Sequence, residues 1–324
     1  MVLYPIDPIL IKFFMNHKEL KYIRIVTLIC FSFGVLGIIS ALAADSQSMM
    51  FDGMYSFIQS IFILLSGYIV KLISRSDNDK YQFGYGAFEP FFIVIRTMCL
   101  IFMDVILIFG SFRDLLNGGY LINAPIAISV TAFSAVVCFF VWLFLYKKAR
   151  ELSSPLLKSE CQSWLNDTLL SVAVLVSFLI MDVLERVGLA NIAAYVDPII
   201  TILFIVVLIP GLMKEAIDST RELLGIAPPV EVQEKLEKII EKYVDAYDFA
   251  DYEIYSQKQG RTVFSMIHII IKRETPVMYL DKVRKEILKE IKKEWSFSDT
   301  DLLFTLNTDW IKYSVPFEIN DMRA

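Results

Sequence analysis

The sequence has little histidine, cysteine or charge. Among its 324 residues there are two histidines and four cysteines, and charged side chains make up 21%. None of the cysteines forms a C-x-x-C pair, so neither a thiolate zinc finger nor a disulfide scaffold is expected. The 31 lysines and arginines are outnumbered by 36 aspartates and glutamates, which leaves no cationic surplus to neutralise a phosphate backbone. We therefore expect no nucleic acid partner.

Motifs of the common enzyme classes are also absent. The sequence contains no G-x-S-x-G, P-loop, H-E-x-x-H or G-x-G-x-x-G. The two glycines of Phe83-Gly84-Tyr85-Gly86 have the wrong spacing to hold a phosphate. We expect no enzymatic activity and no permanently bound cofactor.

Apolar residues are abundant instead. They make up 56% of the chain, against roughly 45–50% in soluble domains, and the mean hydropathy is +0.56. A helix that crosses a bilayer needs about 20 mainly apolar residues. Six stretches are long enough: 22–43, 49–73, 88–112, 120–146, 165–184 and 191–212. These stretches predict an integral membrane protein whose six helices span the lipid bilayer.

Lysine and arginine are concentrated at alternate connections between these stretches. They occur before the first stretch, between the second and third, and between the fourth and fifth: Lys12, Lys18, Lys21, Arg24, Lys71, Arg75, Lys80, Lys147, Lys148, Arg150 and Lys158. The opposite connections carry only Arg113 and Arg186. Because cytoplasmic loops carry the excess of positive residues, both termini are expected in the cytoplasm. Without an organelle address, the expected location is the plasma (inner) membrane.

The chain changes character after residue 213. Charged residues become more frequent, and Ala227-Pro228-Pro229 precedes a new unit. The pattern that follows predicts helix 230–243, strand 249–256, strand 263–272, helix 279–293 and strand 301–308. This order suits a small antiparallel sheet backed by helices. We divide the chain into a cytoplasmic N-terminal segment (1–21), a six-helix transmembrane transport domain (22–213) and a cytoplasmic α+β domain (214–324).

Ionisable residues within or beside the apolar stretches are candidates for function, because each is costly in hydrocarbon. They are Asp45, Asp52, Glu89, Arg96, Asp104, Asp167, Asp182 and Asp197. Asp45, Glu89, Asp182 and Asp197 lie near turns or helix ends, where a structural role is the simpler interpretation. Arg96 can pair with a neighbouring carboxylate or snorkel inward. Asp104, in the middle of its helix, requires a polar partner or a water-filled cavity.

Two polar helix faces stand out among these candidates. Tyr55 and Gln59 follow Asp52 at +3 and +7, which places the three on one face of the second helix. Ser163 precedes Asp167 by one turn of the fifth helix. Two such faces on separate helices can converge on one ion.

With these motifs the sequence resembles the cation diffusion facilitator, or cation efflux, family. The resemblance extends along nearly the whole chain. It rests on residues 46–52, on Phe83-Gly84-Tyr85-Gly86 with Glu89-Pro90, on residues 154–171, on Val196-Asp197-Pro198 and on residues 216–223. It implies six membrane helices followed by a ferredoxin-like cytoplasmic domain. It further implies a homodimeric antiporter that exports a divalent cation from the cytoplasm in exchange for protons.

The expected ion site departs from the family's pattern. Members usually present a His or Asp and an Asp, spaced i and i+4, on each of helices 2 and 5, a set that suits tetrahedral zinc. The matching positions here are Tyr55, Gln59, Ser163 and Asp167, which leaves one carboxylate and no imidazole. Zinc would lose three of its four customary donors.

Two functions therefore remain open. In the first, Asp52 joins Asp167 as a second carboxylate, while Gln59, Ser163 and Tyr55 supply neutral oxygens. Such a site suits Mn²⁺, Mg²⁺ or Ca²⁺ better than zinc. In the second, transport has been lost and the chain is an inactive subunit or sensor that partners an active transporter. A channel lined by the same side chains is a further alternative.

The cytoplasmic domain offers one more candidate ligand and a dimer surface. His268, in the middle of the predicted strand 263–272, matches a strand histidine that often binds metal in the family, although a satisfied sheet residue is the simpler interpretation. The two strands 249–256 and 263–272 alternate apolar and polar residues in part, so one sheet face remains available for contact. We expect a homodimer held together through this domain.

Overall fold

The structure is a computed structural model of the chain. It describes the backbone of residues 8–44, 47–75, 77–119, 124–152 and 154–307, and the side chains of residues 20–39, 56–75, 77–119, 128–152 and 154–307. The chain divides into two compact units, Met1–Arg221 and Glu222–Ala324.

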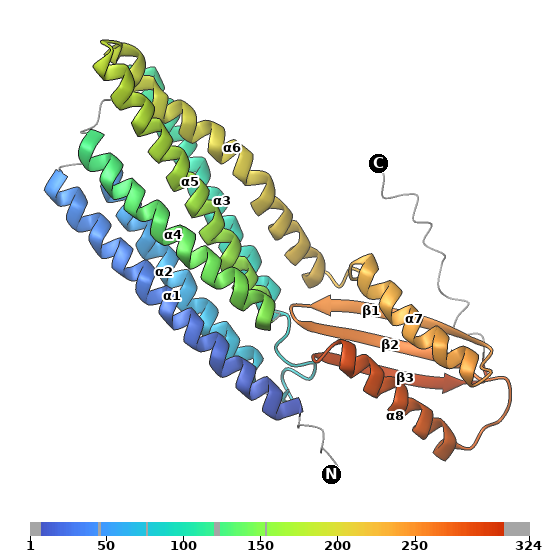
Figure 1. Cartoon of the computed structure of the whole chain (residues 1–324). Helices are drawn as coiled ribbons and strands as arrows, with labels where there is room; N and C mark the ends of the chain where they lie inside the picture. Colours follow the sequence, from blue (N-terminus) through green and yellow to red (C-terminus); the bar gives the residue numbers. More distant parts are fainter. Residues whose placement is uncertain (1–7, 45–46, 76, 120–123, 153, 308–324) are drawn as a thin grey trace. The chain divides into compact units, whose positions relative to one another are not determined.

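Long helices make up the first unit (Figure 1). They are α1 (Pro8–Ala44), α2 (Gln47–Ile73), α3 (Phe88–Leu116), α4 (Ala124–Leu152), α5 (Pro155–Arg186) and α6 (Ala190–Leu223). All six are long and apolar enough to cross a membrane, which confirms the predicted number of spans. The helices are longer than the predicted stretches, and α6 continues past the predicted boundary at residue 213. Residues 120–123, where the fourth stretch was expected to begin, lie outside the described residues.

The start of α5 differs from the prediction, and this difference bears on the site. The helix begins at Pro155 rather than at residue 165. The Ser154 side chain caps it by accepting a hydrogen bond from the Leu157 amide at 3.2 Å, and proline suits the first helical position. Consequently Glu160 and Ser163 belong to the same continuous helix as Asp167.

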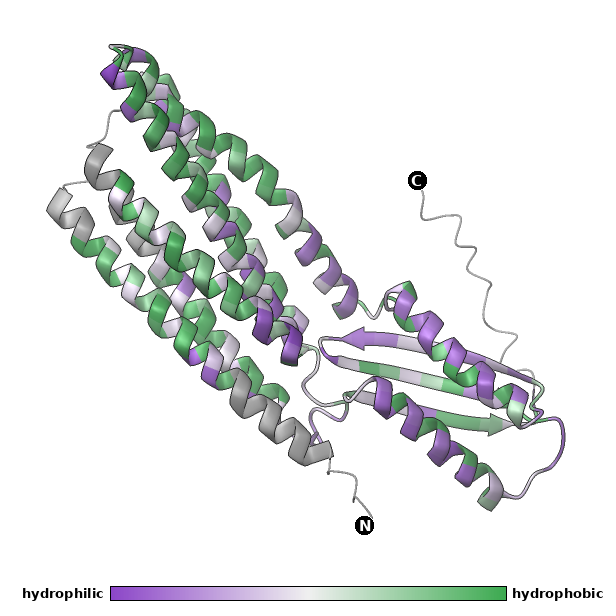
Figure 2. Cartoon of the chain, viewed as in Figure 1, coloured by the Kyte–Doolittle hydropathy of each residue, from purple (hydrophilic) through white to green (hydrophobic). Residues whose placement is uncertain are grey.

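The helices pack closely along part of their surfaces only. α1 lies along α2 and α4 along α5, while α3 contacts both α2 and α5. Their shared core contains Ile23, Val26, Ile63, Val70, Phe92, Ile93, Val141, Leu145, Leu156 and Leu157. Apolar residues make up most of the length of these helices, as the colours of Figure 2 show. Many large apolar side chains are exposed, and Leu28, Phe102 and Phe109 are each about two-thirds exposed. An apolar exterior on helices that satisfy their own backbone groups is the surface that lipid surrounds.

The second unit has the predicted α-β-β-α-β order in a ferredoxin-like arrangement. Its elements are α7 (Val230–Ala246), β1 (Asp251–Gln259), β2 (Thr262–Ile270), α8 (Val277–Glu294) and β3 (Ser298–Thr305). The strand order is β1-β2-β3. The prediction of an antiparallel sheet is wrong for β3: β1 pairs antiparallel with β2, but β3 pairs parallel with β2. The helix α8 carries the chain back to the starting end of β2, so β3 must run in the same direction.

Alternate residues of β2 face the helices. Ile267 and Ile269 are fully buried and pack in one core with Leu236 and Ile240 of α7 and with Ile287 of α8. The residues between them point to the opposite face, as expected for a strand.

Gly119, after α3, tests the packing of the membrane unit. Its φ is +75°, and a Cβ there would lie 2.3 Å from the backbone oxygen of Ala194 in α6. We expect Gly119→Ala to destabilise the protein by roughly 1–3 kcal/mol or more, from both strain and overlap. The melting temperature of the detergent-solubilised chain measures this. The matched control is Gly110→Ala, where no atom lies within 4 Å and the helix favours alanine; equal losses from both would contradict the packing described here.

Candidate cation site

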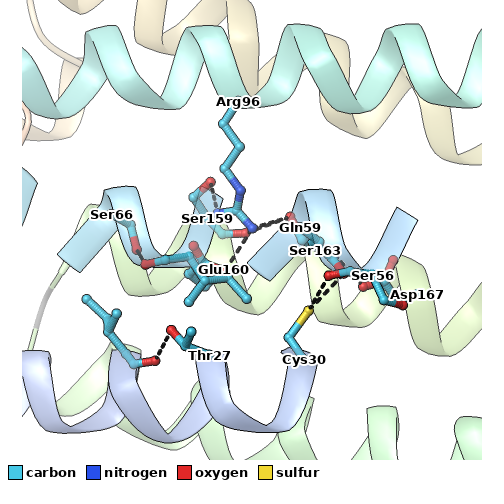
Figure 3. Close-up of polar contacts among 12 residues, drawn as sticks. Thr27, Cys30, Ser56, Gln59, Ser66, Arg96, Ser159, Glu160, Ser163 and Asp167 are labelled. Atoms are coloured by element: carbon cyan, nitrogen blue, oxygen red, sulfur yellow. Dashed lines mark hydrogen bonds and ion pairs between the residues drawn. The ribbon is translucent and has the colours of Figure 1, made fainter. Parts of the chain in front are cut away.

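Gln59 and Asp167 connect the polar faces of α2 and α5. Gln59, 5% exposed, donates from Nε2 to Asp167 Oδ2 at 2.7 Å (Figure 3). Tyr55 and Asp52 precede Gln59 on α2 by four and seven residues. The side chains of both lie outside the described residues. Of the five predicted ion ligands, the structure therefore brings two into direct contact.

The other end of the Gln59 amide faces a thiol. Cys30 of α1 is buried, and its Sγ lies 3.7 Å from Gln59 Oε1 and 3.3 Å from the backbone oxygen of Ser56. The amide thus has its donor toward the carboxylate and its acceptor toward the thiol. This order of contacts links α1, α2 and α5 through one side chain.

Ser163, the third motif position, accepts a hydrogen bond from an arginine. It is 3% exposed, and its Oγ accepts a hydrogen bond from Arg96 Nη2 at 3.0 Å while donating to the backbone oxygen of Ser159 at 3.3 Å. Arg96 also forms an ion pair with Glu160, with 2.8 Å between Nη2 and Oε2. The predicted pairing of Arg96 with a neighbouring carboxylate is confirmed.

A small pocket opens beside Asp167. Its polar lining comes from Asp104 of α3 and from Ser163, Asn166 and Asp167 of α5, and leucine and isoleucine side chains of α3, α5 and α6 complete the wall. The cavity volume is about 20 Å³, enough for one water-sized particle. Asp104, which needed a polar partner or a wet cavity, therefore lines the same pocket as the candidate ligand Asp167.

This arrangement has the chemistry of an oxygen site. Two carboxylates, Asp104 and Asp167, border the pocket, and Asn166 adds an amide, whose oxygen accepts from Gln162 at 3.2 Å. Hard cations prefer such donors. In the part of the chain whose side chains are described, no group of three or more His, Cys, Asp and Glu side chains is placed to hold a metal. Any ion here would therefore depend on amide or hydroxyl oxygens as well as on carboxylates.

The remaining ionisable candidates have structural settings. Asp197 accepts from Ser177 at 2.6 Å, and Asp182 pairs with Arg186 at 2.9 Å. Glu89 is 1% exposed in the first turn of α3, and Asp45 lies outside the described residues.

His268 lies in β2 of the second unit. It is 7% exposed, faces Glu253 across the β1–β2 pair, and its ring lies 5.8 Å from that of Tyr255. Metal binding at His268 stays a prediction.

Several site residues were given no role as ligands in the sequence analysis: Asp104, Asn166, Glu160 and Cys30. Glu160 carried a usable signal, because it precedes Asp167 by seven residues and so shares its helix face. Cys30 carried none, since a cysteine in an apolar stretch is commonly a small core residue.

Apolar helices around buried polar side chains are the architecture of an integral membrane transport protein. Residues 23–224, well over half of the chain, match the cation efflux transmembrane domain. The chain is also 24% identical over 276 residues to the magnetosome protein MamB of Magnetospira sp. (strain QH-2), a match that covers 81% of this chain and 84% of that protein. The chain therefore belongs to the cation efflux family, whose members transport metal cations.

The Gln59 and Asp167 contact can be tested by restoring an acid. Gln59→Glu replaces the amide beside Asp167 with a second carboxyl group. Two carboxylates in contact repel each other unless a proton or a cation lies between them. We expect 1 mM MnCl₂, a concentration on the order of a weak-site dissociation constant, to raise the melting temperature of Gln59→Glu more than that of the wild type. Gln59→Leu is the control; a larger shift there than in Gln59→Glu would disprove the geometry.

Proposed function

We propose that this protein exports a divalent metal cation from the cytoplasm in exchange for protons, with Asp167 as the central ligand. Family membership supports transport of a metal cation. The single observation that carries the proposal is the hydrogen bond between Gln59 and Asp167, which joins the faces of α2 and α5 beside a polar pocket.

The donor types favour a hard ion. Asp167 and Asp104 supply carboxylate oxygens, while Gln59 and Asn166 supply amide oxygens once their present hydrogen bonds rearrange. Mn²⁺, Mg²⁺ and Ca²⁺ bind such oxygens, whereas zinc prefers nitrogen and sulfur. The proposed cargo is therefore an oxygen-preferring divalent ion.

Proton exchange follows from the same carboxylates. When the ion leaves, two acids in a nearly dry pocket repel each other, and protonation relieves that repulsion. When an ion binds, the protons must leave. Asp167 and Asp104 are the groups proposed to alternate between proton and cation.

Orientation and assembly are part of the proposal. The distribution of lysine and arginine supports cytoplasmic termini in a plasma (inner) membrane. The face of the sheet away from α7 and α8 exposes Tyr255 (43%), Met266 (48%) and Leu303 (44%). These apolar side chains support a homodimer formed through the cytoplasmic domain.

One observation favours the alternative of a transport-inactive subunit or sensor. At the motif positions, Gln59 already donates a hydrogen bond to one carboxylate oxygen of Asp167, and Arg96 already donates one to the Ser163 hydroxyl. A chain that satisfies these groups internally keeps the fold without needing an ion.

Reconstituted transport separates the two functions. In proteoliposomes with an imposed proton gradient, we expect the wild type to take up Mn²⁺. We expect Asp167→Asn to take up Mn²⁺ at less than about one-tenth of the wild-type rate, because the variant lacks the central charged ligand. The matched control is Asp182→Asn on the same helix, because Asp182 pairs with Arg186 instead.

Three results would overturn the proposal. Equal uptake rates for Asp167→Asn and the wild type would disprove Asp167 as the central ligand of the site. An uptake rate that stays unchanged when the proton gradient is collapsed would indicate a channel. An absence of uptake for Mn²⁺, Mg²⁺, Ca²⁺ and Zn²⁺ would favour the inactive subunit.

A further inference from the structure

Arg96 is an unusual residue for a membrane helix. It lies on α3 with a relative exposure of 1%, and its guanidinium donates hydrogen bonds to Ser159, Glu160 and Ser163 of α5. Nε has no hydrogen-bond partner within the described residues. A buried charge carries a desolvation cost of several kcal/mol that an ion pair does not always recover, so stability alone explains this arrangement poorly.

The arginine is a neighbour of the proposed ion site. Ser163, which accepts its hydrogen bond, precedes Asp167 by one turn and lines the same pocket. Glu160 precedes Asp167 by seven residues, or about 10 Å along the helix axis. Figure 3 shows Glu160, Ser163 and Asp167 on α5, with Arg96 of α3 in contact with Glu160 and Ser163.

We propose that Arg96 is a tethered cation that determines the ion affinity of the site, because it withholds Glu160 and Ser163 from the transported ion. Its charge partly takes the place of the cation that carboxylates on this face would otherwise bind. Arg96 is thus a specificity-determining residue beside the pocket rather than an ion ligand. This inference rests on the proposed transport site at Asp167.

The surrounding charges define what each substitution does. Besides Glu160 and Asp167, the carboxylate of Glu215 on α6 lies near Arg96 and the Ser159 hydroxyl. Arg96→Gln removes one positive charge and releases Glu160. Glu160→Gln removes the carboxylate that pairs with Arg96. The double variant has the charge of the wild type.

The experiment is a calorimetric titration with Mn²⁺ of the full-length protein in detergent, at one pH and one salt concentration. We expect Arg96→Gln to lower the dissociation constant for Mn²⁺ at least about tenfold and Glu160→Gln to raise it by a similar factor. The reason is that a unit charge about 10 Å from Asp167 acts strongly on a bound ion in a poorly solvated region. The double variant should bind within about threefold of the wild type. Gel filtration and melting temperature establish that each variant is folded.

A purely structural ion pair predicts a different pattern. Both single variants would then weaken binding or leave it unchanged, and that result overturns the inference. If Arg96→Gln does not fold, Glu160→Gln is compared with the double variant, since removing the guanidinium from that background must strengthen binding at least about tenfold. Equal affinities in that comparison would also overturn the inference.

Failure of the proposed function gives a separate result. If the wild type does not bind Mn²⁺ and Arg96→Gln does, transport is not the function of the natural chain, while the role of Arg96 is supported. If neither binds Mn²⁺, Mg²⁺, Ca²⁺ or Zn²⁺, both proposals are wrong. If the wild type binds and Arg96→Gln binds no more tightly, the site stands and the inference about Arg96 fails.

Discussion

A polar group surrounded by lipid and apolar side chains must find its partner within the protein, and this constraint organises the membrane unit. Gln59 bonds to Asp167, and Arg96 pairs with Glu160, each across two helices. Hydrocarbon offers no competing partner, so these contacts hold the register of α2, α3 and α5 as firmly as apolar packing does. The same polar side chains therefore form both the contacts between these helices and the candidate site.

The same constraint explains the contacts of two motif positions, Gln59 and Ser163. An imidazole and carboxylates that bind metal need a cation to satisfy them, whereas an amide can satisfy a carboxylate by itself. Gln59 does so for Asp167, and Arg96 supplies a permanent positive charge next to Ser163. The remaining polar surface shifts toward α3, where Asp104 lines the pocket. A family architecture is retained while the balance of charge inside it is altered.

The second unit follows a different rule. Its core lies on one side of a three-stranded sheet, where Ile267 and Ile287 are fully buried. Charged side chains hold the two helices together at the surface, as Lys242 of α7 pairs with Glu290 of α8 at 2.8 Å. Such exposed pairs contribute little to stability, so the apolar layer maintains the fold.

The sequence by itself determined the six membrane helices, the order of the elements in the second unit and the polar faces of α2 and α5. These features depend on hydropathy and periodicity, which are local properties of the chain. Only the tertiary structure decided that β3 runs parallel to β2, that Arg96 selects Glu160, and that Asp104 shares a pocket with Asp167. Those outcomes depend on which helix or strand lies beside which, and residues far apart in sequence carry no local signal of that neighbourhood.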